Sequence, residues 1–146
     1  MLASRAPADE LVVRYADGRV TGVPIVTIDG RGHLRASDVS LLLGASVHWR
    51  PDLLKMTLRL GEHRVKLTAE NPNVVVDGDT RHFPSPVLFR EGDLLLPIDL
   101  VGSVLVPLVP FPARLDEAAR VLHLGSASER ILGVTLAERP DGLEAT

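Results

Sequence analysis

Apolar and polar residues alternate most clearly between Lys55 and Leu67. Over residues 55–60, and again over residues 63–67, every second residue is Val, Leu or Met, and Gly61-Glu62 separates the two runs. Because successive side chains of a strand point to opposite faces, this pattern predicts a β-hairpin. Its apolar side chains are expected to face one core, namely Met56, Leu58, Leu60, Val65 and Leu67.

Short Val- and Leu-rich runs separated by Gly, Pro and Asp predict more strands in the rest of the first hundred residues. Turns are expected at Asp17-Gly18, at residues 29–32, at Asp77-Gly78 and at residues 90–93. Strands are then predicted on either side of each turn, so the chain is mostly a series of antiparallel hairpins.

Two segments depart from this pattern and predict short helices. Ser37-Asp38 is expected to cap a helix that ends at Gly44, because Ser and Asp favour helix starts and Gly favours helix ends. Residues 97–105 form the second candidate, with Pro97 at the start of the helix. The predicted fold class is therefore α+β, with antiparallel β-hairpins packed around two short helices.

The two helical segments lie in an internal repeat. Residues 32–39 correspond to residues 92–100 with one inserted residue, which makes Asp38 equivalent to Asp99. Downstream the spacing is constant, with Asp52 matching Asp116, Leu58 matching Leu122, Leu60 matching Leu124 and Gly61 matching Gly125. This duplicated strand-helix-strand-strand unit predicts that residues 32–61 and 92–125 superpose.

Composition narrows the functional classes. The chain of 146 residues suits one domain, and its 45% apolar content predicts a folded protein. A net charge of −3, with 16 Lys and Arg among 19 Asp and Glu, predicts no basic surface and therefore no nucleic-acid partner. The longest uncharged run, residues 100–113, contains three prolines, so no membrane span is expected.

A series of short motifs occurs in a recognisable order. They are Leu42-Leu43-Gly44, Val47-His48-Trp49, Asp52, Met56-Thr57-Leu58, Gly61, Val76-Asp77-Gly78, Pro84-Ser85-Pro86 and residues 92–99. Their order and spacing over about residues 10–125 resemble the copper amine oxidase-like N-terminal domain, a bacterial envelope module. One departure is the Pro107–Pro112 stretch, which replaces a strand of that pattern and predicts an irregular second half.

Residues 131–146 resemble the truncated start of an AMIN-like domain, a module of cell-wall amidases. The expected organisation is a tail over residues 1–9, the main domain over 10–125, a linker over 126–130 and this AMIN-like segment. The resemblance implies a non-catalytic extracytoplasmic accessory domain, in the periplasm or cell envelope, of a zinc-dependent N-acetylmuramoyl-L-alanine amidase. The alternative is a stand-alone protein-interaction module of the envelope.

Peptidoglycan or another envelope protein is the partner that this resemblance implies. No signal peptide is visible, because residues 1–7 lack a basic region followed by an apolar stretch.

No catalytic, cofactor-binding or metal-binding residue is expected. No two of the five histidines lie within four residues of each other. His63 has the parity of inward residues and should lie at the core edge, whereas His123 should face outward.

Asp77 and Asp79 flank Gly78, which predicts a turn. No serine lies in a nucleophile motif. His33, His48 and His82 complete the set of histidines.

Five residues are candidates for a binding surface, and they are Trp49, Pro107, Val109, Pro110 and Phe111. Trp49 on a predicted strand could be a carbohydrate platform or a partner anchor, but a role in covering the core is favoured. The apolar loop with three prolines is either an interaction loop or a loop that covers the core.

Overall fold

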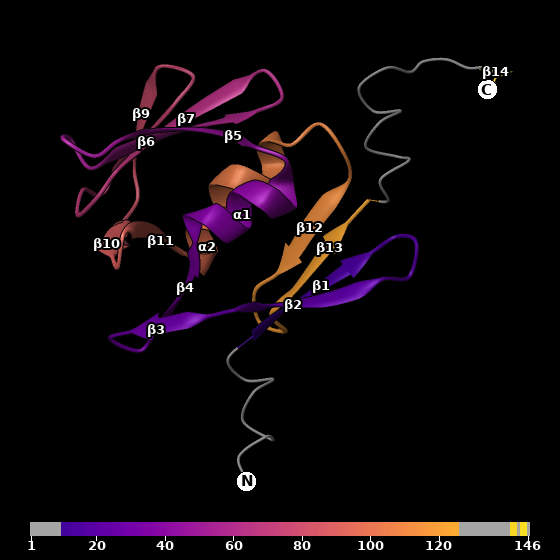
Figure 1. The fold of residues 1–146 in the computed structure, drawn as a ribbon, viewed down its shortest axis with the longest axis horizontal. Helices are drawn as coiled ribbons and strands as arrows, with labels where there is room; N and C mark the ends of the chain where they lie inside the picture. The colour runs from indigo at the N-terminus through magenta and orange to yellow at the C-terminus, as the bar shows by residue number, and fades with distance from the viewer. Residues whose placement is uncertain (1–9, 126–140, 143, 146) are drawn as a thin grey trace, which may run out of the picture.

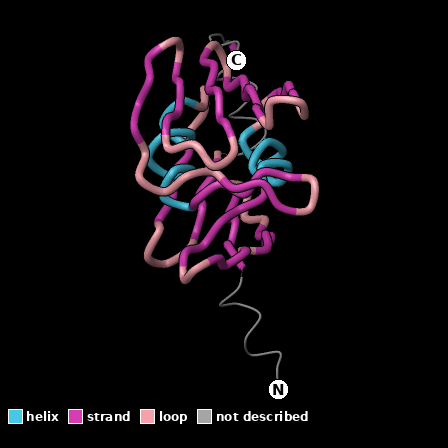
Figure 2. The backbone as a smooth tube through the Cα atoms, turned by 90° about the vertical axis from the view of Figure 1, so that its left-hand side faces the viewer, coloured by secondary structure: helices cyan, strands magenta, loops and turns pink. Residues whose placement is uncertain are grey.

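The computed structural model describes residues 10–125, 141–142 and 144–145. Within residues 10–125, a layer of short helices lies between a five-stranded sheet and the remaining strands (Figure 1). Figure 2 shows the same arrangement from the side, with the helices at mid-height and strands above and below them. The described part is mostly β-sheet with two short helical regions, as the predicted α+β class requires.

The five-stranded sheet is an antiparallel meander. It contains β5 (Ser46–Arg50), β6 (Lys55–Leu60), β7 (His63–Thr68), β8 (Asn73–Val76) and β9 (Asp79–His82), in chain order. The predicted hairpin over residues 55–67 is confirmed as β6 and β7, with Leu60 opposite His63. Its five predicted core side chains are all buried.

A four-stranded sheet closes the other side of the molecule. Its order is β12 (Ala113–Asp116), β13 (Val121–Leu124), β1 (Glu10–Tyr15) and β2 (Val20–Pro24). β1 runs parallel to β13, although more than a hundred residues separate them. The first and last described strands of residues 10–125 therefore lie side by side.

The third sheet joins the two halves of the chain. Its order is β10 (Leu88–Arg90), β11 (Asp93–Pro97), β4 (Arg31–Arg35) and β3 (Val26–Ile28). β4 and β11 are antiparallel, with Leu34 opposite Leu96. Two very short strands, β14 (Asp141–Gly142) and β15 (Glu144–Ala145), pair with each other near the C-terminus. The rest of the predicted linker and AMIN-like segment lies outside the described residues.

Helix α1 (Ala36–Leu43) follows β4 directly and ends at Gly44, whose φ of 68° is the left-handed conformation that favours glycine. The predicted Ser37-Asp38 cap is wrong. The strand runs into the helix without a turn, so Arg35 occupies the cap position and makes no side-chain capping bond. The hydroxyl of Ser37 instead donates a hydrogen bond to Asp93 Oδ2, at 2.7 Å.

The second helical region starts after Pro97, as predicted, but it is less regular. It consists of α2 (Ile98–Leu100), the π-helical turn η2 (Val101–Leu105) and the 3₁₀ turn η3 (Val106–Leu108). The predicted irregular stretch, Pro107–Pro112, begins within η3 and ends directly before β12. Pro107, in the first turn of η3, cannot donate a backbone hydrogen bond, which fits the end of the helix at this point.

The order of elements in the predicted repeat occurs twice. β4, α1, β5 and β6 are followed later by β11, the α2–η2 helix, β12 and β13. Asp38 is the third residue of α1, whereas Asp99 is the second residue of α2. The equivalence of these two residues is not confirmed, and the duplication itself stays a prediction.

One aliphatic core connects the sheets and helices. The fully buried side chains include Leu11 of β1, Leu43 of α1, Leu58 of β6, Leu96 of β11 and Leu122 of β13. They belong to a single cluster of contacting residues, which is why residues far apart in sequence hold one another in place. No helix in the described part of the chain is long and apolar enough to cross a membrane.

Candidate binding surface

The outer face of the five-stranded sheet gathers basic side chains. Alternation along β6 and β7 buries one set of residues and turns the other set outward. The cross-strand register places Arg59 opposite Arg64, and Thr57 between His48 and Lys66. We call the following six residues the basic face: His48, Arg50, Lys55, Arg59, Arg64 and Lys66.

The basic face corrects the expectation that a net charge of −3 brings no basic surface. Strands β5, β6 and β7 contain no Asp or Glu, whereas acids occupy the turns at Asp52, Glu62 and Asp77. Counted along the chain, these acids cancel the basic residues. Within strands β5, β6 and β7 no acid offsets them, and Glu62 and Asp77 meet the basic residues only at the turn end of the sheet. The signal in the sequence is the placement of Lys, Thr and Arg at every second position of one strand and Arg and Lys in the next.

Two shallow grooves cross this face. They have volumes of about 440 and 400 Å³, and Arg59, Arg64 and Lys66 line both of them. Glu62, Val75 and Asp77 also line the first groove. His48 lies along the second groove, whose lining contains no acidic residue. An open, shallow surface of this kind suits an extended polymer better than a small molecule, which prefers an enclosed pocket.

Like charges lie directly opposite each other on the basic face. The pairs are Arg59 with Arg64 and Arg50 with Lys55. Arg50 has a compensating ion pair with Asp52, at 3.2 Å. Within the described residues, the side chains of Arg59, Arg64 and Lys66 form no ion pair. Directly opposed like charges destabilise a sheet, so an anion bound between them would relieve a repulsion that the free protein carries.

Asp77, which lines one groove of this face, has hydrogen-bond partners of its own. It lies in the predicted turn, with a φ of 50°. Its Oδ2 lies 2.7 Å from Nδ1 of His63, and its Oδ1 accepts a hydrogen bond from the backbone N–H of Arg64 at 2.8 Å. These two hydrogen bonds, that of His63 first, lower the pKa of Asp77 below its ordinary value. Asp77 therefore stays ionised at neutral pH and pairs with His63 at the end of the sheet.

Trp49 lies on β5 but points to the opposite side from His48. It is half-buried against the core, and its ring stacks on Phe89 of β10 with centroids 5.8 Å apart and planes 14° apart. This geometry favours the packing role that the sequence predicts, although binding by Trp49 remains untested. Trp49 does not belong to the basic face.

The apolar loop with three prolines, residues 107–112, is called the proline loop. It lies beside Gly61, which follows the last residue of β6. Pro107 and Pro110 are exposed, while Val109 and Phe111 are half-buried against the core. The Pro110 ring covers Gly61 so closely that a Cβ placed on Gly61 would lie 3.3 Å from it. Trp49 pairs with Met56 near the start of β6, so the structure does not bring Trp49 and the proline loop into one surface.

The five histidines are dispersed. His33 is buried on β4, with its Nδ1 3.0 Å from the carbonyl oxygen of Arg31. His48 and His82 are exposed on the five-stranded sheet, His63 is half-exposed at the start of its central strand β7, and His123 lies on β13. Among residues 10–125, 141–142 and 144–145, no group of three or more His, Cys, Asp or Glu could hold a metal ion. That the protein carries no metal stays a prediction.

Comparison with known families adds one finding. Residues 16–109, more than half of the chain, match the family model of the copper amine oxidase N-terminal domain. That N-terminal domain is a non-catalytic accessory domain. No curated protein matches the chain.

Proposed function

Because the chain belongs to the copper amine oxidase N-terminal domain family, we propose that it is a non-catalytic accessory domain whose basic face binds an anionic polymer of the cell envelope. The observation that supports this most directly is the arrangement of Arg59, Arg64 and Lys66 along a groove whose lining contains no acidic residue. In this proposal the domain holds an attached enzyme against its substrate.

The chemistry of the basic face fits a repeating anion. Guanidinium groups bind carboxylates and phosphates through paired hydrogen bonds, and carboxylates occur repeatedly in the peptide stems of peptidoglycan. The six outward basic residues span three adjacent strands, so successive anionic groups of one polymer could each meet a cation. The face presents no Trp, Tyr or Phe on β5–β7, which leaves nucleic-acid bases without a stacking partner.

The attached enzyme is proposed to be an N-acetylmuramoyl-L-alanine amidase. The support is the resemblance of residues 131–146 to the start of an AMIN-like domain, and the proposal includes a location outside the cytoplasm for the same reason. The zinc of such an enzyme belongs to its catalytic domain, and nothing in residues 10–125 is needed to hold it.

A stand-alone protein-interaction module is the second candidate. It is favoured by Leu41 of α1, which is 83% exposed, and by Val47 of the edge strand β5, which is 45% exposed. These two side chains line a groove of about 410 Å³ between α1 and β5. An apolar groove beside an edge strand is a typical place for an added peptide strand.

The test is sedimentation with purified peptidoglycan sacculi. The double variant Arg59→Gln/Arg64→Gln should bind at least about tenfold more weakly, since each charged hydrogen bond is worth about 1.5 to 3 kcal/mol. Binding of the wild type should also weaken as salt is raised, because the cations are exposed.

The matched control is Arg31→Gln/Arg90→Gln, which removes the same charge from exposed residues that are already paired with Asp99 and Glu70. It should bind like the wild type. Equal loss in both variants would show that only net charge matters, and undiminished binding by Arg59→Gln/Arg64→Gln would refute the proposal. Equally tight binding to single-stranded DNA would overturn the choice of polymer.

A further inference from the structure

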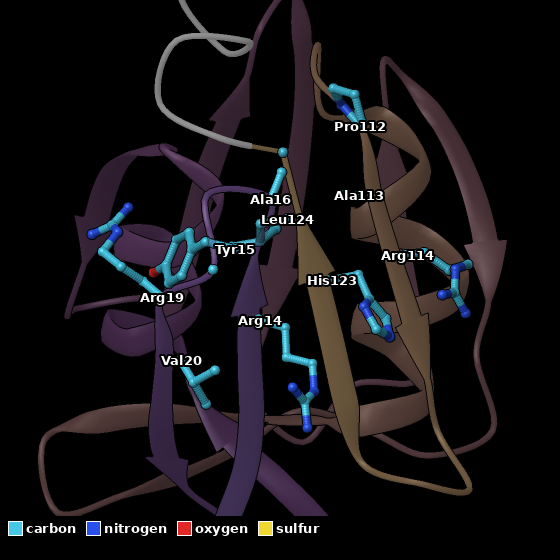
Figure 3. A pocket seen from close by; sticks show the side chains of 12 residues that line it. Arg14, Tyr15, Ala16, Arg19, Val20, Pro112, Ala113, Arg114, His123 and Leu124 are labelled. Atoms are coloured by element: carbon cyan, nitrogen blue, oxygen red, sulfur yellow. The ribbon is translucent and has the colours of Figure 1, made fainter.

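A second basic groove lies on the outer face of the four-stranded sheet formed by β12, β13, β1 and β2. It has a volume of about 710 Å³ and is lined by residues of all four strands (Figure 3). Arg14 of β1 lies opposite His123 of β13, and His123 lies opposite Arg114 of β12. These three side chains therefore stand in one row across three strands, with the imidazole between the two guanidinium groups.

The row lacks a counter-charge from the protein. In the described part of the chain, neither Arg14 nor Arg114 forms an ion pair. The nearest acid on the same face of β12 is Asp116, whose Oδ1 accepts a hydrogen bond from the backbone N–H of Ala119 at 3.1 Å. Three basic side chains thus lie side by side with no carboxylate among them, an arrangement that an anion would stabilise.

The other cation of the groove is already compensated. The guanidinium of Arg19 lies 4.3 Å from the centre of the Tyr15 ring and donates to both carboxylate oxygens of Asp17. This contact covers one face of the Tyr15 ring. Arg14, His123 and Arg114 are therefore the groups of this groove that remain available for an anion.

We propose that this groove is a phosphate-binding site formed by Arg14, His123 and Arg114. Neighbouring strands lie about 4.8 Å apart, so the backbones at Arg14 and Arg114 are separated by roughly 10 Å, a distance that two long side chains close around one tetrahedral anion. Phosphate offers enough oxygen atoms to accept from both guanidinium forks and from the imidazole at once. A carboxylate offers only two oxygens in one plane, whereas even a phosphodiester offers two charged oxygens and two weaker ester oxygens in a tetrahedral arrangement.

This site is independent of the basic face. The helices lie between the sheet that contains β1 and β13 and the five-stranded sheet. The two basic surfaces are therefore on different sides of the molecule (Figure 1). The groove is open, which allows the phosphate to come either from free phosphate or from a phosphodiester polymer. The two sources share the same chemistry and are separated by the choice of probe.

The test is a titration of the ¹⁵N-labelled full chain followed by NMR, with inorganic phosphate, poly(glycerol phosphate) and polyglutamate as separate probes. We expect saturable shifts of the amides of Arg14, His123 and Arg114 with a phosphate probe. Shifts with inorganic phosphate identify the free anion as a sufficient ligand, and shifts with poly(glycerol phosphate) alone identify the polymer as the source. Arg14→Gln/Arg114→Gln should weaken this binding at least about tenfold.

Arg59→Gln/Arg64→Gln removes the same charge from the other sheet and should leave the groove titration unchanged. Equal weakening by both double variants would overturn the site, as would the absence of saturable shifts with both phosphate probes. Polyglutamate binding as tight as the phosphate probes would overturn the choice of phosphate. Because sacculus binding by the basic face is measured separately, failure of either proposal leaves the other one testable.

Discussion

The two faces of the five-stranded sheet are built from the same strands but have opposite chemistry. On the inner face, Leu58 and Leu67 are fully buried against the helices and the other sheets. On the outer face, Arg59, Arg64 and Lys66 are exposed and have no ion-pair partner among the described residues. The inner face is covered within the molecule, whereas the outer face is exposed to solvent. Substitutions one residue apart should therefore affect stability and binding separately.

The largest effect is expected from Leu58→Ala on the inner face. Leu58 is 0% exposed, so its truncation leaves a cavity that the rigid sheet fills poorly. We expect the free energy of unfolding to fall by about 3 to 4 kcal/mol in urea titrations. Sacculus binding by the molecules that remain folded should not change. A loss below about 1 kcal/mol would mean that the inner face is less tightly packed than its burial indicates.

Trp49→Ala should have the next largest effect. Trp49 also faces inward but is only half-buried, and it stacks on Phe89. The expected loss is about 3 kcal/mol of unfolding free energy, with binding to sacculi preserved. Trp49→Phe keeps a ring over Phe89 and should lose less. A variant that is as stable as the wild type but no longer sediments with sacculi would make Trp49 a binding platform.

Arg59→Glu on the outer face should change stability in the opposite direction. It replaces a repulsion across from Arg64 with an attraction, so we expect a gain of about 0.5 kcal/mol at low salt. The gain should shrink at high salt, where exposed charges are screened. Sacculus binding should weaken at the same time. A destabilised variant would indicate that the repulsion between Arg59 and Arg64 does not lower the stability of the free protein.

The smallest effect is expected from Asp77, which lies in the turn between β8 and β9. Its pKa is lowered in the folded state, so its hydrogen bonds stabilise the fold above the unfolded pKa of about 4, and this contribution is lost as the pH falls through the folded value. Asp77→Asn should abolish that part of the acid dependence of the urea midpoint. Asn tolerates the left-handed backbone at this position, which keeps the comparison clean. A constant difference between the two proteins across acidic pH would contradict the assignment.

Local patterns predict local structure well in this chain. The hairpin over residues 55–67 follows from the alternation of its residues and from a Gly turn, and both are properties of a short segment. The cap at Ser37-Asp38 fails because a strand leads directly into α1, a junction that depends on the pairing of β4 with β11. The propensity of Ser and Asp for helix starts does not include that tertiary constraint.

Long-range pairing explains what the sequence alone does not reveal. The groove with Arg14 and His123 exists only because β1 and β13 pair in one register, and no local signal specifies that register. The basic face differs in this respect, because its outward residues follow from the alternation of two neighbouring strands. It could be found from the sequence by assigning each charge to a face instead of summing charges along the chain.

The parallel pairing of β1 with β13 also sets how the domain bears mechanical load. A pull on the chain before Glu10 and after Leu124 acts on two neighbouring parallel strands in opposite directions along their length. The hydrogen bonds between these strands are then loaded together in shear, whereas an antiparallel hairpin pulled from its open end separates one bond at a time. Forced unfolding is governed by the rate of crossing that barrier. A domain pulled by its two chain ends would thus resist tension through β1 and β13.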